Sequence, residues 1–208
     1  MMWRLLLIFT FLIASFPLSA MATEEPKYVL LEQSGDFQLR QYPALIIAEV
    51  EVEGDMDQAS SRGFRLVADY IFGNNRASPG NSEKIAMTAP VTIEPRSEKI
   101  AMRVPVTLQP QAGSWRLNFV MPSQFTLDTL PAPNNPKVVL REVPSRKVAV
   151  LTFSGLASER KTAGKVKELL AWMAGKQLRP LADYELARYN PPWTLPFLRR
   201  NEVMVEYQ

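Results

Sequence analysis

The stretch Glu83–Pro110 decides the predicted fold, because it contains the same alternating pattern of apolar residues twice. It reads Glu83-Lys84-Ile85-Ala86-Met87-Thr88-Ala89-Pro90-Val91-Thr92-Ile93-Glu94-Pro95, and a second copy follows as Ser97-Glu98-Lys99-Ile100-Ala101-Met102-Arg103-Val104-Pro105-Val106-Thr107-Leu108-Gln109-Pro110. Apolar side chains occupy every second position in both copies, which is the pattern of a half-buried strand. The proline inside each run removes a backbone donor, so each strand is expected at a sheet edge or a bulge. The stretch predicts two like strands joined by a short polar link.

Length and composition indicate one globular domain and exclude several kinds of site. The chain has 208 residues, which is enough for one substantial core. Its net charge of +3 gives no reason to expect a nucleic-acid partner. The absence of cysteine excludes disulfides, thiolate metal sites and cysteine nucleophiles, and the absence of histidine excludes the commonest general base and metal ligand. Few catalytic sites remain.

The first 22 residues have the features of a signal peptide. Arg4 supplies a positive charge, an apolar run follows over residues 5–16, and Ala20-Met21-Ala22 fits the small-x-small rule for cleavage. The apolar run is too short to span a bilayer comfortably, which disfavours the alternative of an uncleaved membrane anchor. We expect cleavage after Ala22, export of the mature chain, and a periplasmic location if the source is a Gram-negative bacterium. The membrane is expected to be a partner only through the transient signal peptide.

From residue 28 onward the chain reads as short strands and two helices. Further strands are expected at 28–32, 37–42, 45–53, 114–121 and 202–207. The strand 45–53 alternates between a face expected in the core and a face of glutamates expected in water, namely Ile46, Ala48, Val50 and Val52 against Glu49, Glu51 and Glu53.

Capping residues and apolar stripes define the two helices. The first is expected to begin at Asp55 or Asp57 and to end near Phe72 at a left-handed Gly73. Its apolar stripe comprises Met56, Ala59, Gly63, Val67 and Tyr70. The second is expected to be capped by Ser158 and stopped by Gly175, with a stripe of Ala163, Val166, Leu170 and Met173.

The chain also repeats itself at an offset of 101 residues. Leu39-Arg40-Gln41-Tyr42-Pro43 matches Leu140-Arg141-Glu142-Val143-Pro144, and the same offset aligns Ala48 with Ala149, Gly54 with Gly155 and Ala86 with Ala187. We therefore expect an α+β fold, a distorted β-barrel made of two β-α-β-β halves with one long helix each, related by a pseudo-twofold axis. The halves cover about 28–121 and 137–207. Neither could bury its helix alone, so residues 23–208 count as one domain.

Several motifs then occur in a specific order along the mature chain. They are Phe37-Gln38-Leu39-Arg40-Gln41-Tyr42-Pro43, Gly63-Phe64 with Asp69-Tyr70-Ile71-Phe72-Gly73-Asn74-Asn75, Lys84-Ile85-Ala86-Met87-Thr88-Ala89-Pro90-Val91, Phe119-Val120-Met121-Pro122-Ser123 and Arg199-Arg200-Asn201-Glu202-Val203. Together they resemble the SOUL heme-binding protein family. The resemblance implies a distorted barrel with two helices, and a heme or other porphyrin held non-covalently in a largely apolar cleft. A histidine iron ligand, proposed in some members, is impossible in this chain.

Heme requires a flat apolar slot and cations for its two propionates. The slot is expected to be lined by Phe64, Val67, Ala68 and Ile71, and Met87 is a further binding candidate, because Met87 and Met102 are soft sulfur ligands in principle. The alternative for each of these residues is ordinary core packing. The metal ligand stays open, with phenolates as one choice: Tyr42, Tyr70 or Tyr189.

The segment Pro191-Pro192-Trp193-Thr194-Leu195-Pro196-Phe197-Leu198-Arg199-Arg200 is expected to border the cleft. Trp193 and Phe197 could stack on a flat ring, and Arg199 or Arg200 could pair with a propionate. The alternative is that Arg200 forms a salt bridge with Glu202 or Glu206 and closes the fold.

Three functions compete. The first is an exported, monomeric, non-enzymatic protein that binds a tetrapyrrole or another apolar small molecule for carriage, buffering or sequestration. The second is an enzyme acting on a small hydrophobic ligand in the same cleft, which requires a lone buried acid with a raised pKa: Glu94, Glu142 or Glu185 pointing inward. The third is a protein-interaction module, which requires a large exposed apolar patch.

Overall fold

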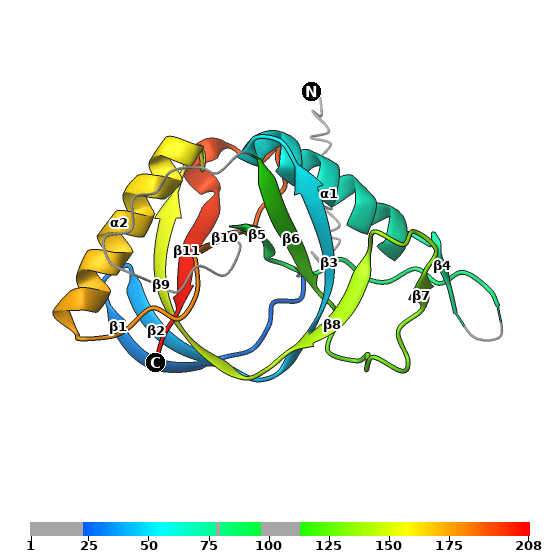
Figure 1. Ribbon diagram of the computed structural model, residues 1–208, viewed down its shortest axis with the longest axis horizontal. Coiled ribbons are helices and arrows are strands. Elements are labelled where there is room, and N and C mark those ends of the chain that lie inside the picture. The colour runs from blue at the N-terminus through cyan, green and yellow to red at the C-terminus, as the bar shows by residue number, and fades with distance from the viewer. Residues whose placement is uncertain (1–22, 78–79, 97–112) are drawn as a thin grey trace, which may run out of the picture.

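The computed structural model describes residues 23–77, 80–96 and 113–208. Within these residues the chain forms a strongly curled antiparallel sheet of nine strands with a helix against each outer flank (Figure 1). The strand order is β1-β2-β9-β11-β10-β5-β6-β3-β8, so the sheet is a half-barrel with β1 and β8 at its edges. The expected α+β fold with two long helices is confirmed.

The element bounds follow the chain in order. The strands are β1 Val29–Ser34, β2 Phe37–Tyr42, β3 Leu45–Glu53, β5 Val91–Pro95, β6 Ser114–Val120, β8 Val139–Val143, β9 Arg146–Ser154, β10 Glu185–Arg188 and β11 Arg200–Glu206. The pair β4 Asn75–Arg76 and β7 Ala132–Pro133 forms a small separate sheet. The helices are α1 Met56–Ile71 and α2 Glu159–Gly175, and Pro196–Leu198 is a short 3-10 helix. None of these helices has the length and apolar character needed to cross a membrane.

Helix α1 begins and ends as its sequence predicts. The carboxylate of Asp55 accepts a hydrogen bond from the backbone N–H of Gln58 at 2.8 Å, which caps the first turn. Gly73 follows the helix with φ of +122°, a conformation that other residues rarely adopt. The predicted stripe is buried against β3 and β6, and Gly63 lets the helix approach the side chain of Leu117 closely.

Helix α2 is capped by Ser158 as expected, but its buried stripe differs from the prediction. The buried residues are Thr162, Val166, Leu169 and Met173, whereas Ala163 and Leu170 are half-buried. The stripe is rotated because α2 places the polar Thr162 against the sheet, which an apolar pattern does not reveal. Gly175 is the last helical residue, and the left-handed position that follows is Gln177, with φ of 59°.

The first copy of the deciding stretch forms a strand only at its end, as β5. The residues before it lie outside any strand and attach instead to the end of α1. The N–H of Ile85 donates to the carbonyl of Ile71 at 2.8 Å, and the N–H of Glu83 donates to the side-chain oxygen of Asn75 at 3.0 Å. The predicted strand was therefore too long at its start, because these amides find partners at the helix end. The second copy, with Met102, lies outside the described residues.

The two halves exchange their first strands. β2 of the first half pairs with β9 of the second, while β8 of the second half pairs with β3 of the first. Without β1, the strand order is symmetric about the centre of the sheet when each strand of the first half is equated with one of the second, namely β2 with β8, β3 with β9, β5 with β10 and β6 with β11. The proposed offset is not constant, since the caps Asp55 and Ser158 are further apart than 101 residues, and Ala187 lies in β10 whereas Ala86 precedes β5. The internal duplication stays a prediction.

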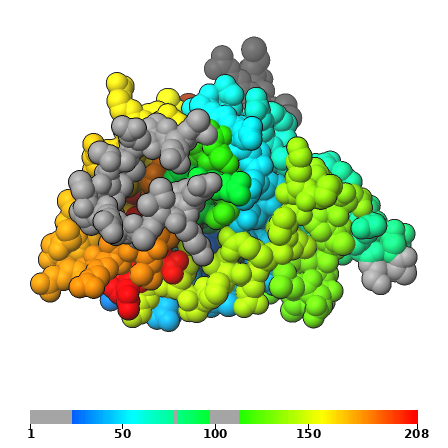
Figure 2. Space-filling model, in the orientation of Figure 1, coloured from blue at the N-terminus to red at the C-terminus, as the bar shows by residue number. Residues whose placement is uncertain are grey.

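The two faces of the sheet differ in chemistry. The helix-covered face carries the main core, which includes Ala48, Val50, Leu117, Leu151 and Val203. The inner face, which points into the half-barrel, carries a small apolar cluster of Tyr42, Val148, Val150, Ala187 and Met204, surrounded by charged side chains. Figure 2 shows the α2 side (yellow and orange) and the α1 side (cyan and green) at opposite ends of the view. We call α2 with β1, β2, β9, β10 and β11 the α2 lobe, and α1 with β3, β5, β6 and β8 the α1 lobe. The ion pairs of Arg40 with Glu202 and of Arg146 with Glu185 lie within the α2 lobe, and that of Arg116 with Glu94 lies within the α1 lobe.

Candidate functional site

The α1 residues predicted to line an apolar slot divide into core and surface. Val67 and Ile71 are fully buried and Ala68 nearly so, as ordinary core packing requires, and a ligand contact by these three residues stays a prediction. Phe64 is 37% exposed, and its ring lies 5.5 Å from that of Phe119. On α1, Phe64 is therefore the candidate that offers apolar surface to a ligand.

Met87 is also 37% exposed, on the segment between α1 and β5. The N-terminal residues of the described chain run past it. The N–H of Ala89 donates to the carbonyl of Glu24 at 2.8 Å, and the carboxylate of Glu24 accepts from the N–H of Ser123 at 3.0 Å. Hydrogen bonding to Ser123 lowers the pKa of Glu24 from its usual 4.5. These hydrogen bonds hold the segment around Glu24 beside Met87.

Residues 191–199 between β10 and β11, which we call the aromatic loop, expose a large apolar surface. Trp193 is 82% exposed and Phe197 is 70% exposed. Leu195 and Leu198 are exposed beside them, and the N–H of Gly155 donates to the carbonyl of Pro196 at 2.9 Å. This bond holds the 3-10 turn against the end of β9. The loop is therefore ordered while its large side chains face outward.

The two arginines after the aromatic loop have different partners. Arg199 donates to the carbonyls of Thr194, at 2.7 Å, and Pro192, and within the described residues no carboxylate pairs with it. Arg200 pairs with Glu202 at 2.9 Å and with Glu25 at 3.0 Å. The predicted alternative, in which Arg200 closes the fold through Glu202, is what the structure contains. Arg199 is the arginine whose charge stays available.

Arg200 belongs to a buried polar network on the inner face that the sequence did not reveal. Arg40 binds both oxygens of Glu202, at 2.8 and 2.9 Å, and the hydroxyl of Tyr189 donates to Glu202 at 2.7 Å. Arg200 also lies over the Tyr189 ring, 3.7 Å from its centre. Burial alone would raise the pKa of Glu202, but hydrogen bonds and charge from Arg40, with Tyr189 and Arg200, hold it below the usual 4.5. The available signal was an arginine inside the alternating strand β2.

The tyrosines considered as iron ligands all have hydroxyls that are engaged in hydrogen bonds. Burial raises the pKa of Tyr70 to about 12, and its hydroxyl donates to the carbonyl of Pro131 at 2.8 Å. Burial also raises the pKa values of Tyr42 and Tyr189. No group of three or more acidic side chains able to hold a metal ion is present in the described part of the chain. All three hydroxyls have hydrogen-bond partners in the structure, and the choice of a phenolate as iron ligand stays a prediction.

Two carboxylates face each other at the centre of the inner face. Glu94 on β5 lies opposite Glu185 on β10, and each is paired with its own arginine, Arg116 at 3.1 Å and Arg146 in a two-pronged contact. Burial, followed by the charge of Glu185, raises the pKa of Glu94 above 4.5. Glu142 is exposed. Glu94 and Glu185 thus point inward as the enzyme alternative requires, but neither stands alone.

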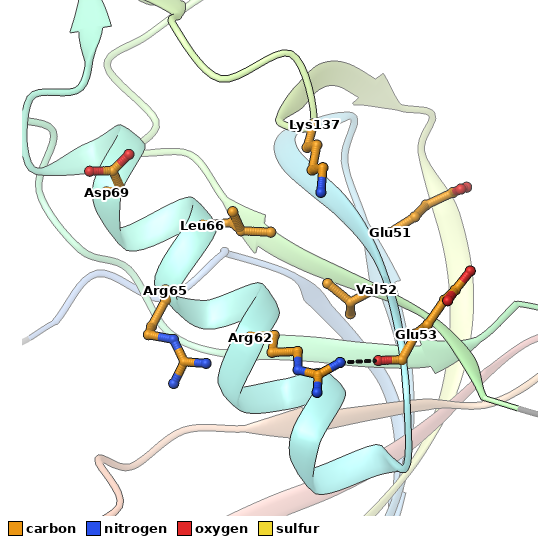
Figure 3. Close-up of a pocket in the computed structure, with 8 residues that line it drawn as sticks. All are labelled: Glu51, Val52, Glu53, Arg62, Arg65, Leu66, Asp69 and Lys137. Atoms are coloured by element: carbon orange, nitrogen blue, oxygen red, sulfur yellow. Dashed lines mark hydrogen bonds between the residues drawn. The ribbon is translucent and has the colours of Figure 1, made fainter.

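Two surface cavities lie away from the predicted residues. The larger, about 740 Å³, is the groove between α1 and β3 shown in Figure 3, which is lined by Glu51, Val52, Glu53, Arg62, Arg65, Leu66, Asp69 and Lys137. The second, about 430 Å³, lies where the two helices begin, between Asp55 and Glu159. Neither includes a residue that was predicted to bind a ligand.

Comparison with solved structures supports the fold alone. The C-terminal domain of EcmrR superposes with a TM-score of 0.58 at 11% identity, over 83% of this chain and 96% of that one. A hydrolase from Listeria innocua superposes with a TM-score of 0.55 at 14% identity, over 86% of this chain and 94% of that one. No curated protein matches the chain.

The family is established by the sequence itself. Residues 23–206 match the family described as SOUL heme-binding protein, which covers nearly all of the chain after the predicted signal peptide. The match begins at the residue that follows Ala22 and ends inside β11. The chain belongs to the SOUL heme-binding protein family.

Proposed function

We propose that this protein is an exported binding protein for heme or another tetrapyrrole, held non-covalently for carriage, buffering or sequestration. The observation that carries the proposal is the aromatic loop. Trp193 and Phe197 present flat apolar surface, and Arg199 beside them has no carboxylate partner in the described residues. Flat rings stack on aromatic side chains, and a guanidinium binds carboxylates with two parallel hydrogen bonds. Membership of a heme-binding family supports the same ligand.

Other contacts bring the remaining candidates toward this loop. Arg188, at the end of β10, donates to the hydroxyl of Ser60 at 2.9 Å, one helical turn from Phe64. Glu25 pairs with Arg200 at the far end of the loop. The neighbouring Glu24 is bonded to Ala89, two residues after Met87. We infer that a bound tetrapyrrole lies on the aromatic loop, with Phe64 and Met87 at its margin.

The protein has few ways to ligate iron. It has no histidine and no cysteine, and the hydroxyls of Tyr42, Tyr70 and Tyr189 are already engaged in hydrogen bonds. Burial of the macrocycle at about 25 cal/mol per Å² of apolar area therefore supplies most of the affinity. Metal-free protoporphyrin is expected to bind nearly as tightly as heme.

Paired titrations test this proposal. Purified protein is titrated with ferric heme and with protoporphyrin, and absorbance and fluorescence report binding. We expect both ligands to bind the wild type and to lose most of their affinity in Trp193→Ala/Phe197→Ala. Leu127→Ala, which removes an exposed apolar side chain elsewhere, is the control and should bind normally. Tight heme binding without protoporphyrin binding would show that iron ligation dominates and would overturn the argument.

A protein-interaction module is the second candidate, because the same exposed loop is the apolar patch that such a function requires. Failure of both porphyrins to bind, with a loop that still captures a protein, would favour it. We propose no enzymatic activity. Glu94 and Glu185 are each neutralised by an arginine, so the lone buried acid that the enzyme alternative requires is absent from the described residues.

Export forms part of the proposal. Residues 1–22 carry the features of a cleavable signal, and the family match begins at residue 23. We propose a periplasmic location in a Gram-negative source, a monomeric state and no nucleic-acid partner. Mass spectrometry of protein from the native host should find Thr23 as the first residue. Intact Met1 in the membrane fraction would contradict cleavage.

A further inference from the structure

The edge of β3 is left open along its last residues. The pairing of β8 with β3 ends at Val139 opposite Glu49, while β3 continues to Glu53 beside β6. Backbone groups of successive residues in a strand point to alternate sides. The carbonyl of Ile46 accepts from Met121, on the β6 side, so even-numbered residues of β3 face β6. Glu51 and Glu53 therefore direct their backbone groups toward the vacated edge.

These backbone groups border the groove in Figure 3. The guanidinium of Arg62 donates to the carbonyl of Glu53 at 3.3 Å across it. No other partner for the backbone of Glu51 or Glu53 on this side is present among the described residues. Val52 and Leu66 give the groove a small apolar surface, and its volume of about 740 Å³ is large enough for several residues of extended chain.

The α1 wall and the loop before β8 supply unneutralised positive charge. Arg62, Arg65 and Lys137 line the groove, and none of them has a carboxylate partner among the residues that the structure describes. Of the acids nearby, Glu51 pairs with Arg96 at 2.9 Å, whereas Asp69 accepts from the neutral amide of Asn74 at 2.5 Å and keeps its charge. Asp69 and Glu53 therefore oppose the three cations, and the charge of the groove stays positive. The groove thus combines a free strand edge with a net positive wall.

We propose that this groove binds an extended segment of a partner protein that carries carboxylate side chains, added as a strand beside Glu51–Glu53. The free backbone groups supply the strand pairing, as in recognition by strand addition. Arg62, Arg65 and Lys137 select for acidic side chains, because charge complementarity fixes the register and rejects basic segments. The surface is separate from the aromatic loop, so the proposal does not depend on tetrapyrrole binding.

Fluorescence anisotropy with designed peptides tests the proposal. The probe is a fluorescein-labelled peptide of about seven residues, a length that suits one added strand, with alternating glutamate and valine. One comparison peptide replaces glutamate by lysine, and another carries N-methyl groups on alternate amides, in both frames. We expect the acidic peptide to bind and the lysine peptide not to bind. N-methylation of the paired amides should weaken binding at least about tenfold, since it removes the pairing donors.

Variants of the protein locate the site. Arg65→Glu/Lys137→Glu should weaken the acidic peptide at least about tenfold and shift preference toward the lysine peptide. Arg160→Glu, on the exposed surface of α2, is the matched control and should leave binding unchanged. Circular dichroism confirms that the variants are folded. The proposal is overturned if the acidic peptide fails to bind the wild type, if N-methylation has no effect, or if the double variant binds normally. Concentration-dependent dimerisation abolished by the double variant would identify a second copy as the occupant instead.

Discussion

Arg40 and Glu202 form a two-pronged ion pair although both side chains are almost completely buried and 162 residues separate them in the chain. Arg40 lies on β2 and Glu202 on β11, with β9 between them. The pair spans the central strand of the α2 lobe on the inner face. Because Tyr189 and Arg200 also bind Glu202, the carboxylate is the point at which three elements meet.

Replacement of Glu202 by glutamine should be strongly destabilising. Breaking a buried ion pair by removing one partner costs about 3–5 kcal/mol, because the other charge stays buried. Urea unfolding at neutral pH measures the loss. Glu206→Gln is the control on the same strand, where the pair with Arg146 is longer, at 3.9 Å, and the cost should be below about 1 kcal/mol. Equal stability of Glu202→Gln and the wild type would contradict the role of the network.

The same pair predicts a direction of pH dependence. The pKa of Glu202 is lowered in the folded protein, so its contribution is complete above the unfolded value near 4.5. That contribution is lost as the pH falls through the lower, folded pKa. The stability difference between the wild type and Glu202→Gln should therefore be constant at neutral pH and shrink in acid. Unfolding midpoints collected from pH 7 down to pH 3 provide the measurement.

Glu94→Gln should show the opposite trend. The pKa of Glu94 is raised, mainly by burial and then by Glu185, so the folded protein favours its protonated form. Ionisation of Glu94 therefore lowers the free energy of unfolding, and this loss grows as the pH rises from 4.5 through the higher, folded pKa. Glutamine does not ionise, so it avoids this loss, and its side-chain oxygen can still accept a hydrogen bond from Arg116. The variant should gain stability relative to the wild type as the pH rises through this window, and a gain in acid instead would disprove the argument.

Gly63→Ala and Gly164→Ala form a matched pair within the two helices. A Cβ atom at Gly63 would lie 2.8 Å from a side-chain carbon of Leu117, whereas nothing lies within 4 Å of one at Gly164. The first substitution should cost about 1–3 kcal/mol through overpacking against β6. The second should stabilise α2 by about 0.5–1 kcal/mol, since alanine is the better helix former. Thermal unfolding of both variants is the test, and similar shifts would refute the close approach of α1 to the sheet.

The two arginines after the aromatic loop should separate ligand binding from stability. Arg199→Gln should weaken heme and protoporphyrin alike, by about 1.5–3 kcal/mol if the propionate contact is shielded from water and by much less if it is exposed. Arg200→Gln should leave porphyrin affinity nearly unchanged and lower the unfolding midpoint, because Arg200 serves Glu202 and Glu25. Porphyrin titration measures the affinity of both variants, and urea unfolding measures their stability. A selective loss of affinity in Arg200→Gln would reverse this assignment.

Local chemistry explains which elements the sequence could predict. β2 and β3 begin and end at the predicted residues, because their alternation is bounded by turns and by Pro43. Asp55 and Ser158 act as caps because they precede helical runs. The start of β5 was placed too early, because alternation cannot show that the amide of Ile85 binds the end of α1. The position of Thr162 in the α2 stripe was missed for a similar reason, since tertiary packing sets the helix rotation.

The candidate site was less predictable than the fold. Val67, Ala68 and Ile71 are buried in the core, whereas Trp193 and Phe197 are exposed, and their role in ligand binding stays a prediction. The role of Arg200 was foreseen as an alternative, but its connection to Arg40 depends on strands distant in sequence. The groove beside β3 had no sequence signal, because it exists only where β8 stops short of Glu53.

The exchange of first strands also constrains when the chain can fold. β2 has only the edge strand β1 beside it until β9 has been made, and β3 lacks β8 until the same part of the chain has emerged. Contacts between segments so far apart form slowly, because a long loop must close before any pairing stabilises it. The first half can pair β1 with β2 and β3 with β6 during synthesis, but one edge of β2 and one edge of β3 stay unpaired until the second half arrives. Unpaired strand edges favour aggregation, so the nascent chain is expected to be a substrate for holding chaperones until β8 and β9 have emerged.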